Sequence, residues 1–200
     1  MIKNIIFDFG DIFVNLRKEA TAQAFQGLGL TEFTYDLEEL NQAYEIGAIS
    51  ELDFLSGFQV HLPQTDLLEI RKAWNSIIGD FPFYRLEFLQ QLKSKYRLFL
   101  LSNTDATHIM YFEQQVGLKF SRDFYNCFEK VYFSYELGLR KPDLLCFQTV
   151  MDRHEIQPEH TLFVDDKKEN TEAAAQLGMA VWNLQVGTED VVQLFDQIKA

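Results

Sequence analysis

The chain contains two hydrophobic patterns: short unbroken apolar runs, and longer stretches with apolar residues at every third or fourth position. An unbroken run is typical of a buried strand in a parallel sheet, whereas the longer period is typical of an amphipathic helix. The runs predict five strands, at 4–9, 98–101, 130–133, 162–164 and 180–182. The longer period predicts helices between and after them, at 83–96, 107–116, 142–153, 168–177 and 188–198. This alternation predicts parallel strands joined by right-handed crossovers, and so an α/β, Rossmann-like core of three layers.

The stretch between the first two predicted strands follows only the helical pattern. Ser50, with Asp53 three residues later, matches a helix N-cap followed by an acidic third residue. Residues that commonly interrupt helices predict the breaks in this stretch: Gly29, Gly47, Gly57, Pro63 and Gly79. We therefore expect an all-helical domain at 16–83, inserted into an α/β core formed by 1–15 and 84–200. In that core, Pro142 is expected in the first turn of its helix.

Composition narrows the class of protein. The 200 residues are 47% apolar and include 19 Phe, which is enough for a sizeable core and argues against disorder. A net charge of −12 argues against nucleic acid and anionic membranes as partners. Cys127 and Cys146 lack metal-ligand spacing and predict free, packed thiols in a reducing compartment. Because the sequence has neither a membrane-length apolar run nor a signal-peptide layout, we expect a cytoplasmic protein.

Polar residues follow the predicted strands at the edge where a parallel sheet binds ligands. They are Asp8, Ser102, Lys141 and the pair Asp165 and Asp166. Each has an ordinary explanation when taken alone, because Asp and Ser often cap helices or turns and Lys is usually a solvated surface charge. Their joint placement along one sheet edge is what points to a functional site.

The chemistry of such a site follows from charge. Two carboxylates 4 Å apart repel by about 4 kcal/mol at an effective dielectric constant near 20, so three of them need a counter-charge. Carboxylate and backbone oxygens are the ligands that Mg²⁺ accepts. Lys141, together with the hydroxyl of Ser102 beside a helix N-terminus, suits an anion. The pattern therefore predicts a pocket for Mg²⁺ and a phosphate, with Asp8 as the candidate nucleophile.

Four segments resemble, in order, the four motifs of the haloacid dehalogenase superfamily: FDFGDIF, LLSNTD, GLRKPD and FVDDKKEN. The helical insert at 16–83 resembles the cap domain of the first type in that superfamily. Gly10 in the first motif makes the chain similar to the branch of small sugar-phosphate phosphatases that resemble α-D-glucose-1-phosphate phosphatase.

This resemblance implies a Mg²⁺-dependent phosphatase acting on a small phosphorylated metabolite, such as a sugar phosphate, with Asp8 forming an aspartyl phosphate. The residues implied to bind the phosphoryl group are Ser102, Asn103 and Lys141. The implied Mg²⁺ ligands are Asp8, the Gly10 carbonyl, Asp165 and Asp166, with Asn170 in support.

One position departs from the pattern. Most phosphatases of the superfamily carry an Asp two residues after the nucleophile as general acid and base, and this chain has Gly10 there. General acid–base catalysis is typically worth ~10²–10⁴-fold, so we expect an active enzyme that is slow on poor leaving groups. Asp11 is the nearby candidate replacement, although a turn-capping Asp would occur at the same place.

Three other functions are open to this sequence. A binding protein could keep the Mg²⁺ and phosphate pocket without turnover, and Gly10 favours that alternative. A 2-haloacid dehalogenase also lacks the second Asp, but its chemistry needs no metal, so the Asp165–Asp166 pair argues against it. A receiver domain usually has its acidic pair early and its Lys last, which is the reverse of this chain, and it has no such helical insert.

Overall fold

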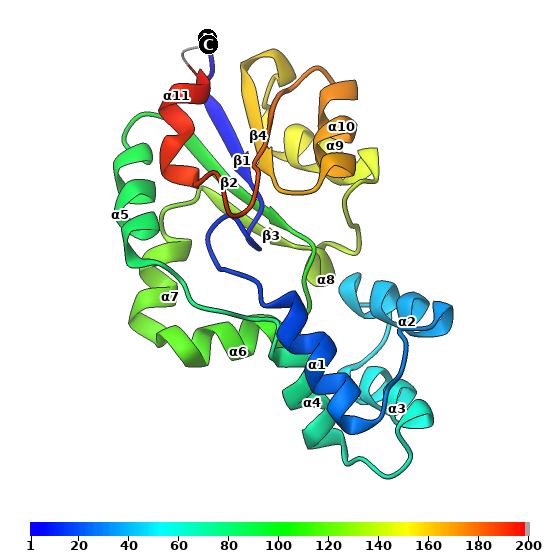
Figure 1. Cartoon of the computed structure of the whole chain (residues 1–200). Coiled ribbons are helices and arrows are strands. Elements are labelled where there is room, and N and C mark those ends of the chain that lie inside the picture. Colours follow the sequence, from blue (N-terminus) through cyan, green and yellow to red (C-terminus); the bar gives the residue numbers. More distant parts are fainter. Residues whose placement is uncertain (199–200) are drawn as a thin grey trace.

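The computed structural model describes residues 1–198 and has a five-stranded parallel sheet at its centre (Figure 1). The strands are β1 Asn4–Phe7, β2 Arg97–Ser102, β3 Lys130–Phe133, β4 Thr161–Asp165 and β5 Ala180–Asn183. Their order is β3-β2-β1-β4-β5, so β1 lies in the middle and pairs with β2 and β4. All five predicted strands are confirmed, but β1 ends at Phe7, two residues earlier than predicted.

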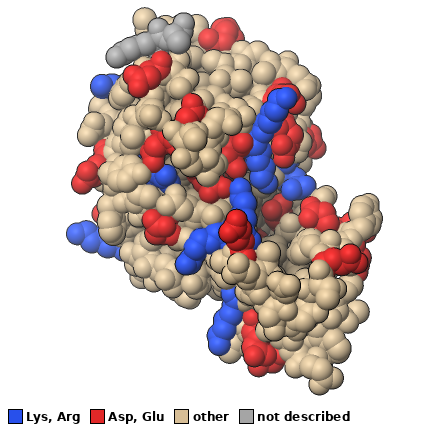
Figure 2. Space-filling view, viewed as in Figure 1, with Lys and Arg blue, Asp and Glu red and all other residues tan. Residues whose placement is uncertain are grey.

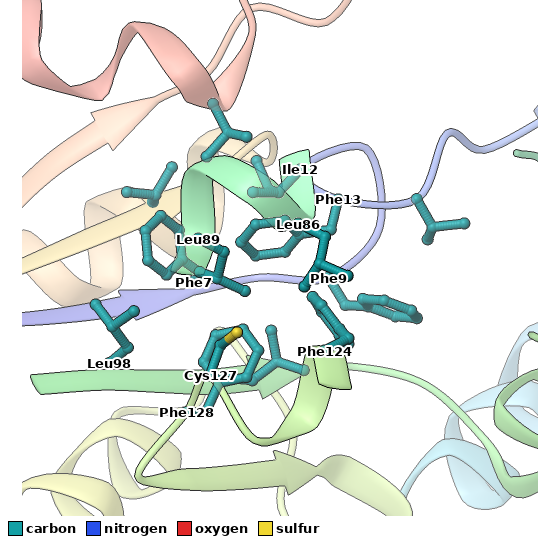
Figure 3. Close-up of a cluster of buried hydrophobic side chains, with 14 of the residues drawn as sticks. Phe7, Phe9, Ile12, Phe13, Leu86, Leu89, Leu98, Phe124, Cys127 and Phe128 are labelled. Carbon is teal, nitrogen blue, oxygen red and sulfur yellow. The ribbon is translucent and has the colours of Figure 1, made fainter. Parts of the chain in front are cut away.

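Successive strand residues point to opposite faces of the sheet, and both faces are covered. Ile5 and Phe7 belong to one hydrophobic cluster and Ile6 to another. The first cluster, shown in Figure 3, packs beneath α5 Phe83–Leu92, α6 Ala106–Val116, α7 Leu118–Tyr125 and α11 Leu194–Ile198. The second packs beneath α9 Leu144–His154 and α10 Lys168–Gln176. The predicted three-layer α/β core is therefore confirmed.

The stretch between β1 and α5 forms a helical block with its own hydrophobic core. Its helices are α1 Lys18–Leu28, α2 Tyr35–Glu45, α3 Glu51–His61 and α4 Leu67–Asn75. The predicted cap of α3 is confirmed: the Ser50 hydroxyl accepts from the Asp53 N–H, and the Asp53 carboxylate accepts from the Ser50 N–H. Figure 1 shows the block beyond the carboxyl edge of the sheet, to which it is joined by two segments bridged at Leu16 and Ile78.

Gly57 does not break a helix as predicted but lies inside α3. A Cβ at this position would come within 2.5 Å of Leu40 Cδ2 on α2. The Leu40 side chain of α2 therefore occupies the space that a side chain at position 57 would need.

Two helix starts in the core also differ from prediction. Pro142 precedes α9, which begins at Leu144. Asp143 is the N-cap of this helix, and its carboxylate accepts a hydrogen bond from the Leu145 N–H. The predicted helix at 188–198 is a short 3₁₀ turn, η2 Val191–Gln193, followed by α11. In both places an Asp side chain sets the start of the helical segment, because Asp190 likewise accepts from the Val192 N–H.

Cys127 and Cys146 are buried free thiols, as the sequence predicts. Within residues 1–198, none of the helices combines the length and the apolar character needed to cross a membrane.

Candidate active site

Lys141 is the centre of a buried ionic cluster. Its Nζ lies 2.8 Å from Asp8 Oδ1 and 2.6 Å from Asp165 Oδ2, and its side chain is 1% exposed. Asp8 directly follows β1 and donates its N–H to the Val164 carbonyl, whereas Asp165 ends β4. The neighbouring strands β1 and β4 thus bring Asp8 and Asp165 together, and the loop before α9 places Lys141 against both.

The loop that carries Lys141 is fixed by Asn103. The Asn103 amide donates to the Lys141 carbonyl at 2.8 Å, and its oxygen accepts from the Lys141 N–H at 2.9 Å. Ser102, the last residue of β2, is 2% exposed. Because the Asn103 side chain is occupied with the Lys141 backbone, a phosphate-binding role for Asn103 would fall to its own N–H.

Asp165 is held rigidly by several donors. Besides Lys141, its carboxylate accepts from the Asn170 amide at 3.0 and 3.1 Å and from the Lys167 N–H at 2.8 Å. Asn170 lies in the first turn of α10 and is buried. Asn170 therefore helps to orient the Asp165 carboxylate.

The donor set at this edge fits a hard divalent cation. One carboxylate oxygen each from Asp8, Asp165 and Asp166 lies within 4.8 Å of the other two. Apart from the Lys141 ammonium, the buried Asp8 Oδ1 has no hydrogen-bond partner within residues 1–198. Three crowded carboxylates with an available oxygen are what a divalent cation with oxygen ligands needs.

Electrostatics in the cluster favour binding of an added cation. Burial raises the pKa of Asp8 to about 6; Lys141 opposes this rise, and the Asp165 and Asp166 carboxylates add to it. Burial and the adjacent Asp165 also raise the pKa of Asp166. Burial disfavours the charge of Lys141, but Asp165 and Asp8 outweigh it and raise the pKa of the ammonium. Lys141 therefore stays positively charged, but its single charge cannot neutralise all three carboxylates.

Asp11 lies beside this cluster with both of its carboxylate oxygens engaged. Its backbone is left-handed, with φ 57°; Oδ1 accepts from the Leu16 N–H at 2.9 Å, and Oδ2 lies 2.7 Å from Lys18 Nζ. Lys18 also lies 3.6 Å from Asp166 Oδ2. Lys18, at the start of α1, is a residue that the sequence analysis missed, because no motif marks it.

Gly10, by contrast, is tied to the packing of Leu16. A Cβ at Gly10 would lie 2.9 Å from Leu16 Cδ1, so the apolar side chain of Leu16 fills the space next to this position. Gly10 also bridges to Val14 in the loop that leads to the helical block.

A second buried polar group joins the helical block to the core. Trp74 on α4 donates its indole N–H to Asp105 Oδ2 at 3.0 Å, and His108 Nδ1 lies 2.9 Å from the same oxygen. The His108 ring stacks on Trp74 with centroids 4.9 Å apart.

On the face seen in Figure 2, several Lys and Arg side chains gather where the block meets the core.

The known proteins to which this chain is similar include hydrolases and phosphatases. A family model described as haloacid dehalogenase-like hydrolase matches residues 2–178. D-ribitol-5-phosphate phosphatase from Bacteroides thetaiotaomicron is 28% identical over 200 residues, covering 94% of this chain and 95% of that protein. The sesquiterpene phosphatase astK of Aspergillus oryzae is 28% identical, covering 88% and 87% of the two chains.

Among solved structures, the chain is similar to a HAD family enzyme, bt-2542, from Bacteroides thetaiotaomicron in complex with magnesium and inorganic phosphate. The TM-score is 0.86 at 31% identity, covering 98% of this chain and 100% of that one.

Proposed function

The chain belongs to the haloacid dehalogenase-like hydrolase family, and from this membership we propose that it is a Mg²⁺-dependent phosphatase acting on a small phosphomonoester. The observation that carries the proposal is the position of Lys141 between Asp8 and Asp165, with Asp166 alongside. This cluster offers a carboxylate nucleophile, a fixed cation for a phosphate and oxygen ligands for a metal.

Asp8 attacks phosphorus in the proposed reaction. A bond forms between an Asp8 carboxylate oxygen and phosphorus as the ester P–O bond breaks and the alcohol leaves with a proton. Water then attacks the phosphorus of the aspartyl phosphate, which restores the carboxylate and releases inorganic phosphate. Lys141, Ser102 and Asn103 bind the oxygens of the phosphoryl group through this exchange.

Mg²⁺ would be held by Asp8, the Gly10 carbonyl, Asp165 and Asp166. When bound, the ion neutralises charge between the carboxylates and the phosphoryl oxygens. Asn170 keeps Asp165 oriented, as its hydrogen bonds to both carboxylate oxygens indicate. The protein's own part is to hold the carboxylates at this spacing before the ion arrives.

Residues 16–83 act as a cap that closes over the site and excludes water during the reaction. The hydrogen bond from Trp74 to Asp105, three residues after Ser102, supports this role because it ties the helical block to the phosphate-binding loop. A closing cap suits a small phosphorylated metabolite better than a phosphoprotein.

Asp11 serves as general acid and base in place of the missing Asp at position 10. Its carboxylate accepts from the Leu16 N–H and pairs with Lys18, so it must give up one of these contacts to accept or donate a proton in the reaction. Because position 10 is Gly and not Asp, a second candidate is a protein that binds Mg²⁺ and phosphate without turnover.

Phosphate release from a panel of phosphomonoesters, with Mg²⁺ and with EDTA, tests the proposal. We expect release that requires Mg²⁺. Binding of phosphate and Mg²⁺ without release from any panel member would establish the second candidate. Halide release from a 2-haloacid in EDTA would instead indicate dehalogenase chemistry.

A further inference from the structure

Lys18 brings a second ammonium group to the proposed metal site, and it belongs to the helical block. It is the first residue of α1, and its Nζ lies 2.7 Å from Asp11 Oδ2 and 3.6 Å from Asp166 Oδ2. Asp166 is one of the three carboxylates that crowd together at the sheet edge. Within residues 1–198, Lys18 is the only residue that forms an ion pair with Asp166. The block therefore supplies a charge that acts directly on a candidate metal ligand.

The helix that Lys18 begins does not explain this lysine. The N-terminus of a helix carries a partial positive charge, so a cation in the first turn is unfavourable and an acid is favourable. Glu19 in the same turn suits the helix, whereas Lys18 does not. Its two carboxylate partners outside the helix are what favour a lysine at this position.

The formal charges around Lys18 match a divalent ion. Two ammonium groups, those of Lys18 and Lys141, lie among the carboxylates of Asp8, Asp11, Asp165 and Asp166. With every group ionised, two negative charges remain in the cluster, and one divalent cation cancels them. Without Lys18 three would remain, so the cluster would attract a cation more strongly.

Of the two lysines, only Lys18 is free to move. The Lys141 side chain is 1% exposed and lies between two carboxylates, whereas that of Lys18 is 57% exposed. Lys18 also lines a cavity of about 450 Å³ between α1 and residues 30–33, so its long side chain has room to change rotamer. Its contact with Asp166 can therefore be given up without disturbing the buried core.

We propose that Lys18 is a positioning residue that competes with the metal ion for Asp166. In the metal-free protein its ammonium holds both Asp11 and Asp166; once an ion is bound, Lys18 keeps only Asp11, the closer partner. This inference rests on the proposed metal site and adds a residue of the helical block that sets how tightly the site binds Mg²⁺.

Calorimetric titration of the metal-free protein with Mg²⁺ alone tests the proposal. Lys18→Met should lower the Kd for Mg²⁺ by about 10-fold, because a unit charge removed a few ångströms from a divalent ion matters even at the dielectric constant of water. Lys18→Arg keeps the charge and should leave the Kd near that of the wild type. Lys119→Met, an exposed change on α7, alters the net charge equally and should change the Kd far less.

Thermal unfolding gives a second readout that a purely structural role would not produce. In EDTA, Lys18→Met should unfold at a lower temperature than the wild type, because Asp11 and Asp166 lose their counter-charge. Saturating Mg²⁺ should narrow this gap, because the variant binds the ion more tightly.

Two failures of the test can be told apart. Normal Mg²⁺ binding by the wild type, with an equal or higher Kd in folded Lys18→Met, would overturn this inference alone. Absence of Mg²⁺ binding by the wild type would overturn the proposed metal site and this inference with it.

Discussion

Lys141 Nζ lies 2.8 Å from Asp8 Oδ1, and the two side chains are 1% and 12% exposed. The proposed nucleophile is therefore paired with a permanent positive charge in a site removed from solvent. The same ammonium contacts Asp165, so a single lysine offsets the charge of two carboxylates until a metal ion adds its own.

Replacing this lysine should affect both stability and phosphate binding. Lys141→Met leaves Asp8 and Asp165 buried without a counter-charge, and breaking a buried pair in this way costs about 3–5 kcal/mol. Urea unfolding measures the loss, and Mg²⁺ should restore more stability to the variant than to the wild type, because it replaces the missing charge. If Lys141→Met were as stable in EDTA as the wild type and equally inhibited by phosphate, Lys141 would have neither role.

Asp11→Asn separates catalysis from turn formation. Asn keeps an oxygen for the Leu16 N–H and tolerates the left-handed backbone, so the fold should persist. If Asp11 protonates the leaving group, hydrolysis of alkyl phosphates should fall by ~10²-fold or more, while aryl phosphates with good leaving groups fall much less. The two substrate classes are assayed side by side, and equal rates for variant and wild type on both would remove Asp11 from the mechanism.

The contact between His108 and Asp105 predicts a pH dependence of stability. Burial alone would lower the pKa of His108, but the Asp105 carboxylate outweighs it, and the pKa is raised above 6.5. Burial likewise opposes the charge of Asp105, yet the charge and hydrogen bonds of His108, together with the hydrogen bond from Trp74, lower its pKa below 3.8. The histidine contribution is complete below pH 6.5 and is lost as the pH rises through the raised value. The aspartate contribution is complete above pH 3.8 and is lost as the pH falls through the lowered value.

The stability difference between wild type and His108→Gln should therefore be largest between these limits and shrink in alkaline solution. Urea unfolding at a mildly acidic and an alkaline pH measures it. A difference that stays constant across this range, or grows with pH, would show that His108 is not charged in the folded protein. The Glu45 charge also raises the pKa of His108. Adding Glu45→Gln to both proteins should therefore slightly reduce the difference between their free energies of unfolding.

Gly47 and Gly138 form a matched pair for testing how α2 docks on the core. Both have left-handed backbones, with φ 69° and 72°, but a Cβ at Gly138 meets no atom within 4 Å, whereas one at Gly47 overlaps Tyr135. Gly138→Ala should cost about 1–2 kcal/mol, from backbone strain alone. Gly47→Ala should cost more, in thermal or urea unfolding, and equal costs would mean that the α2–Tyr135 contact is not tight.

The sequence was sufficient to predict the sheet and the residues at its carboxyl edge. The strand at β1 is apolar on both faces, and Asp8, Ser102 and Asp165 come at or just after strand ends, so parallel topology alone places them at one edge. The contacts between the helical block and the core could not be predicted. Glu45 and Arg140, or Trp74 and Asp105, meet only because the block docks at one angle, and no local pattern encodes that angle.

Gly57 and Gly10 illustrate the same limit on a smaller scale. Local sequence predicts a helix break at Gly57 and a missing acid at Gly10. In the structure each also faces a side chain from elsewhere in the chain, Leu40 and Leu16 respectively. Such packing depends on tertiary neighbours, which propensity and motif spacing do not describe.

The most direct measurement is phosphate release from p-nitrophenyl phosphate in Mg²⁺ by wild type, Asp8→Asn and the exposed control Asp152→Asn. Asn at position 8 preserves the size of the side chain but removes the nucleophilic carboxylate. We predict that Asp8→Asn releases phosphate no faster than the buffer does, while Asp152→Asn matches the wild type. Folded Asp8→Asn that retains a substantial part of the wild-type rate would contradict Asp8 as the nucleophile.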